Sequence, residues 1–144
     1  MASVDYLVEI LMKTFDSFIS FFPKNTVITF VPTTKRRLKQ RGFNQAEILA
    51  QRLADYSGLE LLPLLKRFDK SQQQAKLSRA DRKLNLSNSI AANECFKKFV
   101  NSGHLILVDD IATTCSTLNE CSKALRYFHP SEITAFVLAR SYLV

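Results

Sequence analysis

Cysteine is scarce in this 144-residue chain, and no cysteine motif is present. The three cysteines, Cys95, Cys115 and Cys121, form no CxxC pair and leave an odd thiol. The odd count argues against a disulfide framework, and the missing pair argues against a structural zinc site. We therefore expect reduced thiols and a cytoplasmic protein.

A long uninterrupted apolar run is also missing. The best candidate, residues 4–22, is broken by Asp5, Glu9, Lys13 and Asp16, which excludes a membrane span and a signal peptide. Its apolar residues recur at helical spacing, so we expect an amphipathic helix over residues 1–22. Such a helix would pack on a sheet or against a partner chain, which leaves a homodimer open.

Glycine-rich nucleotide motifs are absent as well. The chain has three glycines, no GxGxxG and no Gly-Lys-Ser/Thr, so neither the dinucleotide fingerprint nor the Walker loop is present.

Apolar residues are plentiful, at 47%, which is enough for the core of one domain spanning residues 1–144. Apolar runs that read as strands alternate with segments of helical spacing. This alternation predicts an α/β fold, an open and mainly parallel β-sheet flanked by helices with a Rossmann-like core. The expected strands are 26–31, 59–65, 104–108 and 133–139, and the expected helices after the first are 43–56 and 117–128.

Positive charge is concentrated in two segments. The chain carries a net charge of +7, whereas residues 35–41 alone carry +5 and residues 66–83 carry another +5. We expect both segments to be loops. If they overhang the same end of the sheet, they form a site for a polyanion; otherwise they are two solvated basic loops.

Residues 105–118 carry the clearest chemistry. An apolar strand is followed by Asp109 and Asp110, a hydroxyl-rich loop and a helix start. Ligands bind at the carboxyl ends of strands in open α/β sheets, and a helix start suits a phosphate. Carboxylates repel phosphate, so the two aspartates would bind sugar hydroxyls or Mg²⁺. The alternative is that Ser116 or Thr117 caps the helix and the aspartates are ordinary loop acids.

Residues 108–118 resemble the phosphoribosyl pyrophosphate (PRPP) loop of type I phosphoribosyltransferases. The run Arg41-Gly42-Phe43-Asn44-Gln45 and residues 74–85 narrow the resemblance to the ComF, or competence-protein, branch. The three motifs occur in the family's order over residues 31–140.

The resemblance implies a role for each motif. Asp109 and Asp110 would be the catalytic pair, binding the ribose hydroxyls of PRPP directly or through Mg²⁺ that arrives with PRPP, with no metal held by the protein alone. The other implied groups are the 5′-phosphate loop (Thr113, Thr114, Cys115, Ser116, Thr117), the pyrophosphate loop (Thr33, Thr34, Lys35, Arg36, Arg37), the branch motif (Arg41, Gly42, Asn44, Gln45) and a flexible loop (Gln74, Ser78, Arg79, Arg82).

Two features depart from the family pattern. Cys115 stands where the family has glycine, and a Cβ at a position of positive φ costs about 1–2 kcal/mol. The cysteine-rich zinc module that often precedes the transferase domain in this branch is expected to be absent.

Three functions remain open. The first is transfer of phosphoribosyl from PRPP to an acceptor, with release of pyrophosphate. The second is a non-catalytic role in DNA uptake, with single-stranded DNA or a competence helicase bound by the basic loops. The third is a PRPP-sensing regulator without chemistry.

Overall fold

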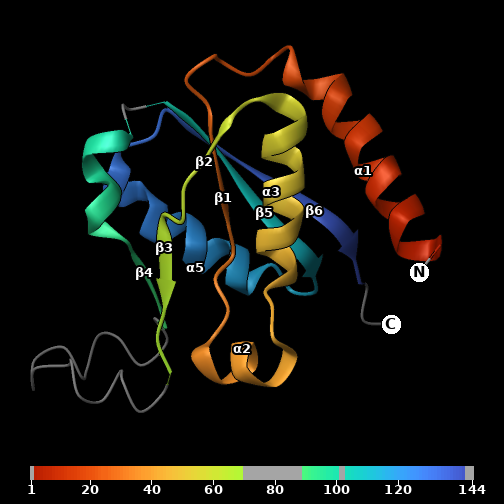
Figure 1. The fold of residues 1–144 in the computed structure, drawn as a ribbon. Helices are drawn as coiled ribbons and strands as arrows, with labels where there is room; N and C mark the ends of the chain where they lie inside the picture. Colours follow the sequence, from red (N-terminus) through yellow and green to blue (C-terminus); the bar gives the residue numbers. More distant parts are fainter. Residues whose placement is uncertain (1, 70–88, 101–102, 142–144) are drawn as a thin grey trace, which may run out of the picture.

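A four-stranded parallel sheet forms the centre of the computed structural model, which describes residues 2–69, 89–100 and 103–141 (Figure 1). The strand order is β2 (Glu60–Leu61), β1 (Val27–Phe30), β5 (His104–Ala112) and β6 (Glu132–Arg140), and every neighbouring pair is parallel. The predicted open parallel sheet is therefore confirmed.

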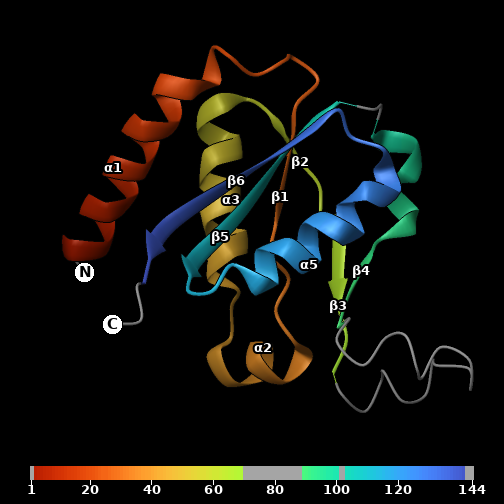
Figure 2. The same ribbon diagram turned by 180° about the vertical axis from the view of Figure 1, so that it is seen from behind.

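Helices cover both faces of this sheet. Helix α3 (Gln45–Ser57) lies on one face and α5 (Ser116–Leu125) on the other, as the two opposite views show (Figures 1 and 2). Helix α1 (Ala2–Ile19) packs against α3 and β6. The core lies between these layers, where β1 and the first five residues of β5 are buried. Most of these buried side chains are apolar.

The expected strand 59–65 is wrong in its extent. Only β2 joins the sheet, while β3 (Leu65–Arg67) pairs antiparallel with β4 (Ile90–Ala92) in a separate two-stranded sheet. Pro63, which has no N–H to donate, lies between the two strands. Leu64 instead donates its N–H to the Thr29 hydroxyl, at 3.2 Å.

Residues 35–41 are helical, so the prediction of a basic loop here is wrong. Helix α2 (Lys35–Arg41) begins after Thr34, whose Oγ1 accepts the Arg37 N–H at 3.2 Å. It ends at Gly42, which adopts the left-handed conformation at φ 79° and donates its N–H to the Leu38 carbonyl. A cap residue at one end and a glycine at the other are the local signals that mark the two ends of this helix.

Two further boundaries differ from expectation. Strand β5 continues through Asp109 and Asp110 to Ala112, because it pairs with β6 along this whole length. The expected helix 117–128 stops at Leu125 and continues as a 3₁₀ turn, η3 (Arg126–Phe128). A second 3₁₀ segment, η2 (Glu94–Phe99), follows β4.

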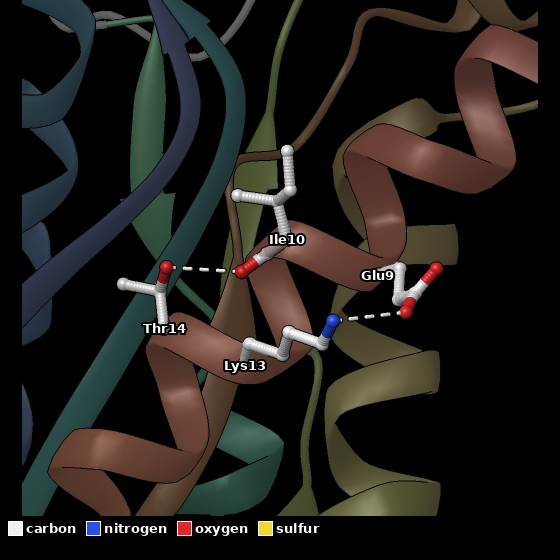
Figure 3. Close-up of polar contacts among 4 residues, drawn as sticks. All are labelled: Glu9, Ile10, Lys13 and Thr14. Atoms are coloured by element: carbon white, nitrogen blue, oxygen red, sulfur yellow. Dashed lines mark hydrogen bonds and ion pairs between the residues drawn. The ribbon is translucent and has the colours of Figure 1, made fainter.

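Helix α1 ends at Ile19 and buries part of the expected apolar stripe, while Ile10 and Phe18 remain exposed. Phe15 is fully buried and packs edge-on against Phe136 of β6, with ring centroids 5.3 Å apart. On the outer side Lys13 pairs with Glu9 at 3.1 Å, and the Thr14 hydroxyl donates to the Ile10 carbonyl (Figure 3). Across the described residues, no helix has the length and apolarity needed to cross a membrane.

His104, at the start of β5, is a buried structural residue. Its ring nitrogens lie 3.4 Å from the Thr26 hydroxyl and 2.7 Å from the Thr134 hydroxyl, and its ring centroid lies 4.7 Å from that of Phe22. Burial lowers the pKa of His104 below its ordinary value, while the Glu132 carboxylate opposes this shift. The fold therefore holds the neutral ring.

The protein should lose stability in mild acid through His104. The unfolded chain binds a proton at this residue more readily than the folded chain, so stability present above the ordinary pKa of 6.5 is lost as the pH falls below it. Replacing His104→Gln should flatten the fall in melting temperature between pH 7.5 and pH 5. His129→Asn is the matched control, because it removes an exposed histidine and should leave the slope unchanged. An equal slope in all three proteins would contradict the prediction.

Candidate active site

The parallel register of β1 and β5 places two loop segments at one edge of the sheet. Phe30 is level with Val108, and the Val31 N–H donates to the Val108 carbonyl at 2.9 Å. The segment that leaves the sheet after β1 therefore begins beside Asp109 and Asp110, while β5 continues along β6 to Ala112. Figure 1 shows α2 and the start of α5 at this edge.

The adjacent aspartates sit at the end of β5 in different environments. Asp109 is 8% exposed, and its Oδ1 accepts the Asp110 N–H at 2.9 Å. Asp110 is half-buried, and its Oδ1 accepts the Ile111 N–H at 2.8 Å. Burial, followed by hydrogen bonding with the Asp110 carboxyl, raises the pKa of Asp109 to about 7, while the Asp110 backbone N–H and the charge of Arg67 oppose the shift. Asp109 can therefore hold or release a proton near neutral pH.

The hydroxyl-rich loop surrounds a small cavity of about 40 Å³, here called the loop cavity. The Thr114 and Ser116 hydroxyl oxygens lie 3.0 Å apart, and α5 begins at Ser116. Cys115 precedes this helix with φ 59°, so the residue that replaces the family's glycine does adopt the left-handed conformation. The structure brings together all five predicted residues of the loop, since the lining includes Thr113, Thr114, Cys115, Ser116 and Thr117.

A second cavity of about 150 Å³, the central cavity, joins the loop cavity to the basic elements. The two cavities share Asp109, Ile111 and Thr117. The central cavity brings the aspartates next to the predicted residues of both earlier motifs. Its polar lining comprises Thr33, Arg37, Arg41, Asn44, Gln45, Arg67, Asp109, Asp110 and Thr117.

The branch motif is partly structural. Asn44 caps α3, since its Oδ1 accepts the Ala46 N–H at 3.1 Å, while its Nδ2 donates to the Val31 carbonyl at 3.1 Å. Gly42 supplies the left-handed end of α2. Asn44 and Gly42 thus fix the path of the chain, while Arg41 and Gln45 line the central cavity.

A third cavity of about 710 Å³, the outer cavity, lies between α2 and the base of the β3–β4 sheet. It shares Arg37 and Arg67 with the central cavity. Of the predicted pyrophosphate loop, Thr34, Arg36 and Arg37 line the outer cavity and Thr33 lines the central one. Lys35 lines none of the three cavities. The predicted flexible-loop residues Gln74, Ser78, Arg79 and Arg82 lie outside the described residues.

Arg67 is a site residue that the motifs do not single out. Its Nη1 donates to the Pro32 carbonyl at 3.4 Å, and its buried Nε has no hydrogen-bond partner within the described residues. Its charge also acts on Asp109. The available signal was its place in the basic segment 66–83, but charge alone does not distinguish Arg67 from six neighbouring cations. Phe43 and Ile111, two exposed apolar side chains of the central cavity, lie inside the recognised motifs but were given no role.

A cavity at the opposite end of α5 is a poorer candidate. It measures about 650 Å³ and is lined by Arg126 and His129 together with Glu132. An anion there would face the Glu132 carboxylate and the carbonyl end of α5, both of which repel it. The motif residues do not reach it.

Comparison with known proteins identifies the family. No protein-family model matches the chain. Competence protein F of Haemophilus influenzae is 38% identical over 112 residues, which are 77% of this chain and 48% of that protein. Competence protein ComFC of Bacillus subtilis is 30% identical over 131 residues, which are 87% of this chain and 49% of that protein. The chain belongs to the ComF family of competence proteins. It spans about half the length of these ComF relatives.

Solved structures support the same fold. The allosteric regulatory enzyme of purine biosynthesis matches with a TM-score of 0.55 and 17% identity, over 78% of this chain and 22% of that one. Glutamine PRPP amidotransferase from B. subtilis, complexed with ADP and GMP, matches with a TM-score of 0.50 at the same identity and coverage. The type I phosphoribosyltransferase-like fold expected for a ComF protein is therefore confirmed.

Asp109→Asn should stabilise the protein at alkaline pH. A carboxyl with a raised pKa binds its proton more tightly in the folded state, so its ionisation lowers stability as the pH rises from about 4 to 7. The asparagine variant escapes this loss. It should gain on the order of 1–2 kcal/mol relative to the parent protein between pH 5 and pH 8, measured by urea unfolding. The Asp110→Asn variant should still lose most of this stability as the pH rises, because burial is the main cause of the raised pKa of Asp109.

Cys115→Gly should stabilise the loop modestly. Glycine removes the Cβ strain at φ 59° but adds freedom to the unfolded chain, so the expected gain in unfolding free energy is at most about 1 kcal/mol. Cys115→Val, which places a branched side chain in the same conformation, should lose more than about 1 kcal/mol. Equal urea midpoints for the two variants would mean that the left-handed conformation imposes no strain here.

Proposed function

We propose that the chain binds PRPP at the three connected cavities and transfers its phosphoribosyl group to an acceptor, releasing pyrophosphate. One observation carries the proposal: the loop cavity, the two aspartates and the arginine cluster follow one another in the order of the 5′-phosphate, ribose and pyrophosphate of PRPP. This order supports the role assignments that follow from the family resemblance.

The loop cavity suits the 5′-phosphate. The first backbone N–H groups of α5 have no partner within the helix, and the positive end of the helix dipole faces the loop. The hydroxyls of Thr113, Thr114 and Ser116 add donors. The small volume of the cavity fits a phosphate held by backbone and hydroxyl groups.

The aspartates suit the ribose. Carboxylate oxygens accept hydrogen bonds from the 2′- and 3′-hydroxyls, and Asp110 is the more accessible of the two. The pair also fits Mg²⁺ that is shared with ligand oxygens, since this ion is typically held by one or two carboxylates plus phosphates. Within the described residues no group of three or more histidine, cysteine or acidic side chains could hold a metal by itself. When bound, Mg²⁺ would supply positive charge next to the pyrophosphate oxygens.

The arginines suit the leaving group. As the bond from C1 of the ribose to pyrophosphate breaks, positive charge develops on the ring and negative charge on the departing oxygens. Arg36, Arg37 and Arg67 present guanidinium groups to this region, where fixed charges stabilise the developing negative charge. The unpartnered Nε of Arg67 is a donor available for that purpose within the described structure.

Calorimetric titration with PRPP tests the proposal. Binding should require Mg²⁺, exceed that of ribose 5-phosphate at least tenfold, and strengthen as the pH rises through 7, because Asp109 ionises there. Asp109→Asn combined with Asp110→Asn should abolish binding, whereas Asp55→Asn, an exposed acid on α3, should not change it. Undiminished affinity in the double variant would refute the site.

A second candidate function is favoured by the charge of α2 and by the relatives' description as competence proteins. Here the chain would act in DNA uptake without catalysis, binding single-stranded DNA or a helicase partner. PRPP would then produce no heat, while a single-stranded oligonucleotide would bind with an affinity that falls steeply with salt.

A further inference from the structure

Helix α2 is the most highly charged element of the described structure and the least supported by packing. Its seven residues include five cations and no acid, and none of its side chains is buried. Figures 1 and 2 show it beyond the carboxyl ends of the strands, apart from the layers that contain the core. Apolar burial therefore contributes almost nothing to its stability.

The charges of α2 also oppose its helical state. Lys35 and Lys39 are four residues apart, as are Arg37 and Arg41, and like charges at this spacing destabilise a helix. None of these cations has an ion-pair partner in the part of the chain that the structure describes. Helices much shorter than about 12 residues are marginal even without such repulsion. The contacts that stabilise the helix are the Thr34 cap and the Gly42 turn.

The cations of α2 are divided between two sides. Arg36, Arg37 and Arg41 line the central or outer cavity, whereas Lys35 and Lys39 line neither. With about 100° between successive residues, Lys35 and Lys39 share one side of the helix, Arg37 and Arg41 lie on the opposite side, and Arg36 lies between the two sides. An anion in the cavities would thus contact the arginine side alone.

We propose that α2 is an anion-coupled helix, whose helical state is marginal when the cavities are empty and is stabilised when a pyrophosphate-like anion occupies them. The helical conformation places Arg37 and Arg41 side by side, where one anion neutralises both, and so turns their repulsion into a shared contact. An anion that binds the helical state better shifts the population toward it. The inference rests on the proposed function only in its choice of ligand, the pyrophosphate end of PRPP.

Two variants of the full chain, isomers with the same net charge, test this coupling. Lys35→Glu and Lys39→Glu change the net charge equally, on the side of α2 that faces away from the cavities. Glu at position 35 lies in the first turn and precedes Lys39 by four residues, and both features stabilise a helix. Glu at position 39 lies in the last turn, where the helix dipole disfavours it. Simple electrostatic attraction predicts equal loss of anion affinity, whereas coupling predicts a difference.

Hydrogen exchange of the α2 amides and calorimetry with inorganic pyrophosphate are the two measurements. Pyrophosphate should slow exchange in α2 of the parent protein. Without ligand, exchange should be slower in Lys35→Glu than in Lys39→Glu, and Lys35→Glu should bind pyrophosphate about three- to tenfold more tightly. Equal affinities, or exchange in α2 that pyrophosphate leaves unchanged, would overturn the coupling.

The result is separable from that of the proposed function. If PRPP binds with Mg²⁺ but the two isomers bind pyrophosphate equally, the function stands and the coupling fails. If the isomers differ as expected while PRPP binds no better than pyrophosphate, the coupling stands and the phosphoribosyl site fails.

Discussion

The parallel register between β1 and β5 is the constraint on which the candidate site depends. Phe30 lies level with Val108, and both strands are buried up to that point. The threonines that follow β1 and the aspartates that follow Val108 therefore emerge at the same level of the sheet. A shift of register by one residue would turn Asp109 to the opposite face and separate it from the arginines. The packing of the buried β1–β5 strand pair thus sets the positions of the polar side chains in the site.

At the carboxyl end of the parallel strands, a buried acid lies near exposed basic side chains. Asp109 is held in an environment that favours its protonated form, while the cations of α2 are surrounded by solvent. Arg67 links the two, because its charge acts on Asp109 and its side chain lines both the central and the outer cavity. Within the described residues, none of the α2 cations has an ion-pair partner. Shared lining residues connect the three cavities, so that the buried acid and the exposed bases belong to one continuous region.

Much of the fold could be predicted from the sequence, because strand and helix patterns are local. The sheet, its parallel strands, the helix predicted over residues 43–56 and the cavity formed by Thr113 and its neighbours all follow from short runs of residues. The division of residues 59–65 between two sheets was missed, since it depends on which distant strands accept their hydrogen bonds. The helical state of α2 was missed because its charge pattern suggests a loop, while its caps are single residues. The role of Arg67 depends on a cavity that no local pattern describes.

Strand β6 forms one edge of the described sheet, and between its charged ends, Glu132 and Arg140, every residue is uncharged. One side of its backbone accordingly offers a row of donors and acceptors that no other described strand pairs with. An unblocked edge of this length is a template for intermolecular strand addition and for aggregation. The ring of Phe15 against Phe136 covers part of one face of this strand. Removal of helix α1 would therefore uncover Phe136 and place an apolar surface beside the unpaired edge of β6.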